Sequence, residues 1–280
     1  QDSVLPGLPA VLQERMREDA ELYGFHHGRG SILRFERSVK RPMNIWVLLP
    51  TYNEASNISA LIGEILSVVP QSRVLVVDDD SPDGTSGIVA RMAASDGRIH
   101  FVSRKGGRGR GRGRAGVEGF RCAISSGADF VVEMDADFSH QPRYIPELLN
   151  AARECGVSVA SRWMTQAGIC GRPAYRDILS LLARFVCRFF LGMRLSDPTS
   201  GFRCFSRRAL ESIDWDRIIS TGPSIVGEII LLLQDKGFVF REVPIVFMER
   251  RSGRTKLNAL KLLSALFALF KVKFRLWAGI

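Results

Sequence analysis

The segment Phe130–His140 constrains the fold of this chain more than any other stretch. It begins with an apolar run rich in β-branched residues, which is typical of a buried strand. Two aspartates, Asp135 and Asp137, follow it and are separated only by Ala136. Because ligands of open α/β sheets lie beyond the carboxyl ends of the strands, both carboxylates should face a substrate. Mg²⁺ and Mn²⁺ prefer such oxygen ligands. The alternative is a solvated strand exit, where Asp is common.

Strand-like and helix-like segments alternate along the chain. Strands are expected at residues 44–49, 73–77, 99–103 and 157–160, and a pair of strands broken near Pro244 at 238–247. Helices are expected at 57–69, 85–94, 117–126, 144–154, 176–193 and 224–234. This spacing predicts βαβ units and an α/β fold, with a mostly parallel central sheet flanked by helices. The polar loops Pro50–Glu54 and Asp78–Asp80 follow strands, so they should meet the two aspartates at one edge of the sheet. The three acids Asp78–Asp80 suit hydrogen bonds to a nucleobase and a ribose, although a plain turn rich in Asp, Pro and Gly would look the same.

Basic residues are concentrated in two segments. The net charge is +10, and much of it falls within residues 104–121 and 250–280. Such patches favour phosphate-bearing partners: a nucleotide, a lipid phosphate, a membrane surface or nucleic acid. Gly111–Gly116 matches the pattern G-x-G-x-x-G, but it follows the third expected strand rather than opening the fold. Since this region alternates glycine with arginine, we expect residues 104–116 to form a mobile flap over phosphates. A dinucleotide-binding turn and a solvated basic loop are the alternatives.

The expected helix Arg176–Met193 is apolar apart from one polar stripe. The stripe recurs every four residues and consists of Arg176, Ser180, Arg184 and Arg188. Residues at this spacing share one face of a helix. An interfacial helix whose arginines meet lipid headgroups fits the pattern. A core helix with one solvated edge would look similar, so the sequence leaves both interpretations open.

Segments at both ends of the chain look like additions to the central domain. Residues 1–42 are expected to form an N-terminal extension, in which the adjacent His26 and His27 fit a surface loop better than a metal site. In the tail, residues 257–280, the run Leu262–Phe270 carries no charge. It is much shorter than the roughly twenty residues of a spanning helix. With basic residues around it, the tail should be an amphipathic membrane anchor, and packing onto the domain is the alternative.

Six motifs that occur in order along the chain carry a family resemblance. They are Leu49–Glu54, Asp78–Thr85, Asp135–Asp137, Ser161–Arg162, Asp197–Phe202 and Gly253–Lys256. Together they resemble the motifs of the dolichyl-phosphate mannose synthases, which are inverting family-two glycosyltransferases with a GT-A fold. The resemblance covers about residues 43–257 and implies a GT-A domain at residues 43–256.

The resemblance also implies roles for individual residues. The donor nucleotide would be bound by Pro50, Tyr52, Glu54, Val77, Asp79, Asp135, Ala136 and Asp137. A metal would be held by Asp135, Asp137 and Ser139. Donor or acceptor phosphates would be bound by Arg162, Arg176, Ser180, Arg250 and Lys256, and the catalytic residues would be Asp137, Arg162 and Arg176. Two departures stand out, because Ser139 occupies a position that is often Gln in the family, and the flap carries arginines in place of a Gly-Leu-Gly-type segment.

The predicted activity is mannose transfer from GDP-mannose to a polyprenyl or dolichyl phosphate, with inversion and with Mg²⁺ or Mn²⁺ as cofactor. The acceptor phosphate is already anionic near neutral pH, so no general base is needed. One alternative is a related enzyme that uses another donor such as UDP-glucose. Another is a non-enzymatic binder of nucleotides or nucleic acid, but the flap lacks the aromatic residues on which bases would stack.

The expected location is the cytosolic face of a membrane, with peripheral attachment and no nucleic-acid partner. Five cysteines without a C-x-x-C pair favour a reducing compartment over a zinc site or a disulfide framework. Whether a separate membrane-anchoring subunit takes part is left open by the sequence.

Overall fold

The computed structural model describes residues 42–104, 111–165, 167–170, 174–249 and 259–279. Met43–Ile280 form one compact unit. The expected N-terminal extension, including its two histidines, lies outside the described residues apart from Pro42. The same is true of Arg250, Lys256 and the last of the six motifs.

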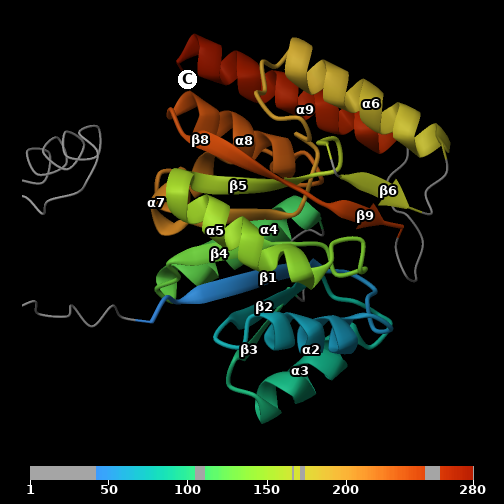
Figure 1. The fold of residues 1–280 in the computed structure, drawn as a ribbon, viewed down its shortest axis with the longest axis vertical. Coiled ribbons are helices and arrows are strands. Elements are labelled where there is room, and N and C mark those ends of the chain that lie inside the picture. Colours follow the sequence, from blue (N-terminus) through green and yellow to red (C-terminus); the bar gives the residue numbers. More distant parts are fainter. Residues whose placement is uncertain (1–41, 105–110, 166, 171–173, 250–258, 280) are drawn as a thin grey trace, which may run out of the picture. The chain divides into compact units, whose positions relative to one another are not determined.

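A seven-stranded sheet with the order β3-β2-β1-β4-β7-β5-β8 runs through the centre of this unit (Figure 1). Its strands are β1 Ile45–Thr51, β2 Arg73–Asp78, β3 Ile99–Ser103, β4 Phe130–Glu133, β5 Gly156–Ser161, β7 Arg203–Ser206 and β8 Val239–Pro244. All neighbouring pairs are parallel except those of β7, which lies antiparallel between β4 and β5. A second, two-stranded sheet pairs β6 Gly168–Cys170 with β9 Val246–Met248. The predicted α/β class with a mostly parallel sheet is therefore confirmed.

Helices cover both faces of the large sheet. The described helices are α2 Ile58–Val68, α3 Thr85–Ser95, α4 Arg112–Ser125, α5 Ile145–Cys155, α6 Ala174–Phe189, α7 Arg207–Glu211, α8 Ile225–Asp235 and α9 Ala259–Ala278, with short 3₁₀ turns at Pro142–Tyr144 and Trp215–Arg217. Alternate side chains of β1 point to opposite faces of the sheet, as the pleat of a strand requires. Ile45, Val47 and Leu49 join the core beneath α2 and α5, whereas Trp46 and Leu48 join the core with α4 and α8.

A third layer lies over α8. There α6 and α9 run side by side at one end of the molecule (Figure 1), and the rings of Phe190 and Phe270 are 6.5 Å apart. Leu269 and Val272 of α9 are buried in one cluster with Ile230 and Leu231 of α8. Gly227 of α8 permits the close approach, because a Cβ added there would lie 2.7 Å from Leu269 Cδ1. One face of the predicted tail thus packs onto the domain. Among the described helices, none is long and apolar enough to cross a bilayer.

Two regions differ from the sequence-based expectation. The first is β7, because the sequence indicates only a polar turn at Asp197–Arg203, whereas the chain enters the middle of the sheet immediately afterwards. The second is the predicted flap. Residues from Arg112 onward form the first turns of α4, so the expectation of a mobile loop as far as Gly116 is wrong, and residues 105–110 lie outside the described part. Close packing explains the helix start, because Gly113 N donates to Thr221 O at 3.1 Å.

Candidate active site at the carboxyl edge of the sheet

The loop after β4 presents its two aspartates in different environments. The side chain of Asp135 is 39% exposed, whereas Asp137 is buried. Asp137 Oδ1 accepts hydrogen bonds from the backbone N–H of Ser139 at 3.1 Å and from its hydroxyl at 2.6 Å. Phe138 turns the chain with a positive φ of 63°, a conformation that costs energy for a bulky residue and often marks a functional loop. The loop therefore folds back on itself and fixes the direction of Asp137.

His140 holds the backbone of the same loop through a hydrogen bond. Its Nδ1 accepts a hydrogen bond from the backbone N–H of Asp135 at 3.0 Å, which places the proton of the neutral ring on Nε2. The ring is buried and stacks on Phe202, with centroids 5.2 Å apart. Burial lowers the pKa of His140, and the carboxylates of Asp135 and Asp137 oppose that effect. A neutral histidine thus serves as a support for the backbone of Asp135.

The two buried acids at the end of β2, Asp78 and Asp79, have different partners. Asp78 is buried and accepts hydrogen bonds from the hydroxyls of Thr51, Ser81 and Ser86 at 3.0, 2.6 and 2.6 Å. It holds the loops after β1 and β2 together. Asp79 instead contacts the guanidinium of Arg104 and accepts from Gly111 N–H at 2.5 Å.

The predicted donor-site residues of β1 and β2 lie at neighbouring strand ends. Pro50 is in register with Val77, one residue before the pair Thr51 and Asp78. The backbone N–H of Glu54 donates to Thr85 Oγ1 at 2.9 Å, which ties the loop of Tyr52 and Glu54 to the start of α3. Ala136, which separates Asp135 and Asp137 in the sequence, is buried. The structure thus gathers the strand-end groups that the sequence predicted to meet.

Arg162 follows β5 and is held by a polar pair. Its Nε and Nη2 donate to the two oxygens of Asp197 at 2.7 and 2.9 Å, and Nη2 also donates to Thr199 Oγ1 at 2.9 Å. Burial lowers the pKa of Arg162, but the carboxylate of Asp197 more than offsets this, so the pKa is raised. Burial likewise raises the pKa of Asp197, and Arg162 more than compensates, which leaves it below its usual value. Both groups are therefore charged, and the fork of Arg162 is rigidly oriented.

The first turn of α6 carries Asp177, whose carboxylate is among the charges that raise the pKa of Arg162. This turn therefore lies near Arg162. Arg176 belongs to that turn, although its side chain is outside the described part, and Ser180 is half-buried one turn later. Arg184 then lies over the ring of Trp163, at 5.7 Å from the centroid. The predicted polar stripe therefore begins beside the site.

Sequence reasoning singled out none of three charged residues near Asp135, although one of them, Arg112, lies within the predicted flap. Glu133 ends β4 and Arg203 begins β7; both are buried, they are in register across the strands, and Arg203 Nη2 lies 3.3 Å from Glu133 Oε2. Burial lowers the pKa of Arg203 to about 10, against the effect of Glu133. The third residue, Arg112, lies 2.7 Å from Asp135 and 3.5 Å from Glu133. A Glu within an apolar strand was the available signal, because a buried charge requires a partner.

The donor set at this edge fits a hard divalent cation. Asp135 and Asp137 offer carboxylate oxygens on a loop that is fixed by Ser139 and His140. Mg²⁺ is commonly bound through one or two carboxylates, with water and substrate phosphates completing the shell. Ser139 donates its hydroxyl proton to Asp137, so in this arrangement it orients a carboxylate.

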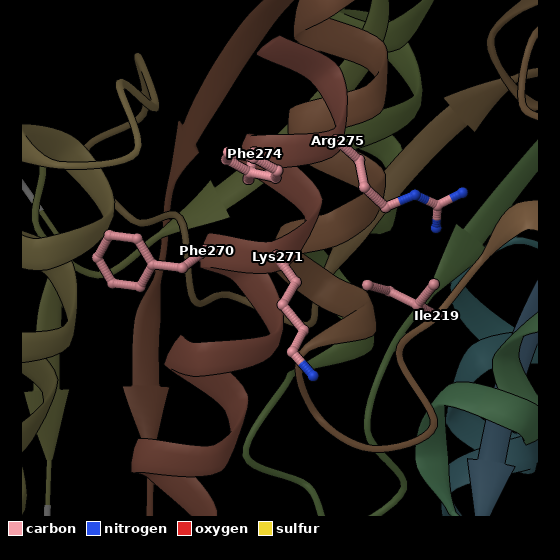
Figure 2. Close-up of a pocket in the computed structure, with 5 residues that line it drawn as sticks. All are labelled: Ile219, Phe270, Lys271, Phe274 and Arg275. Atoms are coloured by element: carbon pink, nitrogen blue, oxygen red, sulfur yellow. The ribbon is translucent and has the colours of Figure 1, made fainter. Parts of the chain in front are cut away.

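Large apolar side chains are exposed on α6, on the residue that follows it, and on α9. This α6/α9 face consists of Ile178, Leu181, Leu182, Phe185, Phe189, Phe190, Leu263, Phe267, Phe270, Phe274 and Trp277. An open groove of about 560 Å³ borders it, lined by Ile219, Phe270, Lys271, Phe274 and Arg275. In Figure 2, Arg275 points toward Ile219, while Phe270 points away from both. Basic and aromatic side chains are thus mixed along α9.

Comparison with known proteins gives both sequence and structural relatives. The family model "Glycosyl transferase family 2" matches residues 46–214. An undecaprenyl-phosphate mannosyltransferase from Micrococcus luteus is 37% identical over 77% of this chain and 88% of its own. A polyprenol monophosphomannose synthase from Mycolicibacterium smegmatis is 34% identical over 82% of this chain and 87% of its own.

The similar solved structures have lower sequence identity. Glucosyl-3-phosphoglycerate synthase from Mycobacterium tuberculosis, in complex with Mn²⁺, UDP and phosphoglyceric acid, has a TM-score of 0.62 and 19% identity over 83% of this chain and 79% of its own. Mannosyl-3-phosphoglycerate synthase from Rubrobacter xylanophilus has a TM-score of 0.59 and 21% identity over 83% and 73% of the two chains. These structures share the fold with this chain.

Proposed function

The chain is a glycosyltransferase that belongs to glycosyl transferase family 2, and we propose that it transfers mannose from GDP-mannose to a polyprenyl phosphate. Its relatives from Micrococcus luteus and Mycolicibacterium smegmatis are named for mannose and a polyprenol, which supports the sugar and the acceptor class. The GT-A-type fold expected from the sequence agrees with the solved neighbours.

One observation carries the proposal: the adjacent residues Gly111 and Arg112 contact Asp79 after β2 and Asp135 after β4. The Gly111 contact is a hydrogen bond from its backbone N–H, and the Arg112 contact is an ion pair. The nucleotide end and the diphosphate end of a donor therefore have neighbouring polar anchors. In the proposed arrangement, Asp79 with the Pro50–Glu54 loop binds the guanosine part. Asp135 and Asp137 lie under the diphosphate.

The chemistry requires charge control more than proton transfer. A bound Mg²⁺ or Mn²⁺ would neutralise charge on the departing diphosphate. The acceptor phosphate oxygen is anionic, so it attacks without a general base. Arg162 contributes a charged fork of fixed direction beside the site, and such preorganised cations stabilise charge that develops in the transition state. Attack opposite the leaving group would invert the donor linkage.

The acceptor would reach this site along the α6/α9 face. Exposed aromatic side chains with flanking lysines and arginines are typical of helices that lie in a membrane interface. The first turn of α6 lies near Arg162, so the same helix connects the apolar face to the catalytic edge. We therefore place the enzyme peripherally at the cytosolic face of a membrane, where Arg176, Ser180, Arg250 and Lys256 would meet the acceptor phosphate.

A transfer assay tests the proposal directly. The full chain would be incubated with a polyprenyl phosphate and either GDP-mannose or UDP-glucose, with Mn²⁺, with Mg²⁺ or with a chelator. We expect a lipid-linked product from GDP-mannose in the presence of either cation and little product from UDP-glucose. Preference for UDP-glucose would overturn the donor assignment, and full activity with the chelator would overturn the role of the cation.

A further inference from the structure

Arg112 occupies a position between two acidic residues at the start of α4. Its Nε and Nη2 lie 3.1 and 2.7 Å from Asp135 Oδ1, and Nη2 lies 3.5 Å from Glu133 Oε1. Nevertheless, among the described residues, the buried Nη2 group has no hydrogen-bond partner of good geometry. The guanidinium is thus close to its anions while part of its donor capacity is unused.

The surrounding backbone is shaped to hold this side chain. A Cβ on Gly201 would lie 2.7 Å from Arg112 Nη2, so the glycine leaves room for the guanidinium. A Cβ on Gly113 would lie 2.5 Å from Ser220 O, which fixes the helix start against the loop before α8. Because the backbone is held on that side, a change in the contacts of Arg112 would occur through its flexible side chain.

Glu133 does not depend on Arg112 for compensation. Arg203 lies 3.3 Å from Glu133 and donates from Nη1 to Val226 O at 2.6 Å, and both charged side chains are fully buried. This pair belongs to the interior of the sheet. The charge of Arg112 is therefore associated chiefly with Asp135, the more exposed of the two aspartates among the predicted metal ligands.

We propose that Arg112 is a donor-positioning residue that passes from Asp135 to the diphosphate of the nucleotide sugar as the donor and its cation bind. A divalent cation on Asp135 would repel a guanidinium at the same carboxylate. The diphosphate carries the negative charge and the paired oxygens that an arginine fork recognises. The start of α4 adds backbone N–H groups of the same polarity. This inference rests on the proposed function.

Arg112→Gln separates this role from a structural one, because the two affinities change in opposite directions. Binding of Mn²⁺ alone, followed by electron paramagnetic resonance of the free ion, should become several-fold tighter, because a competing charge is lost from Asp135. Binding of GDP at saturating Mn²⁺, followed by calorimetry, should weaken about tenfold, as expected for a lost charge-assisted contact.

Two further variants serve as controls. Arg114→Gln makes the same chemical change on the exposed side of the first turn of α4, and it should change each affinity less than about twofold. Arg112→Lys keeps the charge without the fork, so Mn²⁺ affinity should stay near that of the parent protein while GDP affinity falls. Thermal unfolding of every variant checks that the fold is retained.

The outcomes distinguish the inference from its premise. If the parent protein binds GDP with Mn²⁺ but Arg112→Gln weakens both ligands together, or leaves both unchanged, the transfer of Arg112 is overturned and the proposed function stands. If the parent protein binds no GDP in the presence of Mn²⁺, the proposed function fails and the inference fails with it.

Discussion

Charged side chains are buried at the carboxyl edge of the sheet, whereas large apolar side chains are exposed on the α6/α9 face. At the edge, Glu133 and Arg203 have no exposed surface. On the face, Phe189 and Trp277 are 72% and 82% exposed. Both regions reverse the usual partition of residues between core and surface. A buried charge or an exposed apolar patch costs free energy unless another group compensates it. The compensating groups differ between the two regions.

The partners of the buried charges lie within the chain. Each guanidinium at the edge contacts a carboxylate: Arg104 meets Asp79, Arg162 meets Asp197 and Arg203 meets Glu133. Some apolar side chains of the α6/α9 face contact one another, as in the stacked rings of Phe185 and Phe189 at 5.5 Å. An apolar patch of this size indicates a surface for interaction. The buried charges named here are thus paired within the fold, whereas the exposed apolar side chains of the α6/α9 face indicate a partner outside the chain.

The largest effect should come from Asp137→Asn, which removes a charge that the edge provides for the substrate. Transfer should fall at least about a thousandfold, because several kcal/mol of transition-state stabilisation by a cation would be lost. The asparagine can still accept the hydrogen bonds of Ser139, so the midpoint of thermal unfolding should shift by only a few degrees. Near-parental turnover in a lipid-product assay would contradict the assignment of Asp137.

Arg203→Met tests the compensation inside the edge. Removing one member of a buried ion pair leaves an uncompensated charge, and the free energy of unfolding should fall by about 3–5 kcal/mol. Arg241→Met is the matched control, because Arg241 pairs with Glu154 at 2.8 Å where both side chains are exposed. That substitution should cost less than about 1 kcal/mol. Equal losses in urea denaturation would remove the distinction between the two pairs.

Replacing three exposed aromatics of the α6/α9 face by serine should have an intermediate effect. In the triple variant of Phe185, Phe189 and Trp277, partitioning onto anionic vesicles should weaken about thirtyfold, through lost apolar burial in the interface. Stability in solution should be unchanged, since these side chains are exposed. Point substitutions are preferable to removing the tail, because Leu269 and Val272 belong to the core.

Val239→Ser provides the control for that experiment, because Val239 is an exposed apolar residue of β8 and belongs to neither α6 nor α9. Its vesicle binding should match that of the parent protein. Equal sedimentation of the triple variant and the parent protein with vesicles would rule out membrane contact through this face.

The smallest effect on transfer is expected for a substitution in the first turn of α6, between the carboxyl edge of the sheet and the α6/α9 face. Arg176→Ala should raise the acceptor requirement or slow transfer about tenfold, through loss of a charge-assisted phosphate contact. GDP affinity without acceptor should change little. Arg188→Ala removes an exposed arginine of the same stripe three turns further along α6, so it should have a much weaker effect. If Arg176→Ala impaired GDP binding as severely as acceptor use, the assignment of Arg176 to the acceptor would be wrong.

Much of the fold follows from local sequence patterns. The expected strand at residues 99–103 coincides with β3, and the expected helix at 57–69 exceeds α2 by one residue at each end. Apolar periodicity and turn residues act over a few positions, so they are legible without the tertiary structure. Because parallel strands end at one edge, the sequence also determined that Asp79, Asp135 and Asp137 would lie near one another.

The tertiary structure decided which charges face each other and which apolar surface stays exposed. Glu133 and Arg203 are 70 residues apart and meet only because β7 enters the sheet antiparallel beside β4. Arg112 reaches Asp135 because glycine packing against Thr221 starts α4 earlier than its apolar pattern indicates. On α6, the helical pattern specified a stripe without saying which side would be covered. Pairing across strands and burial by distant segments depend on contacts that are far apart in the chain, and local propensity carries no record of them.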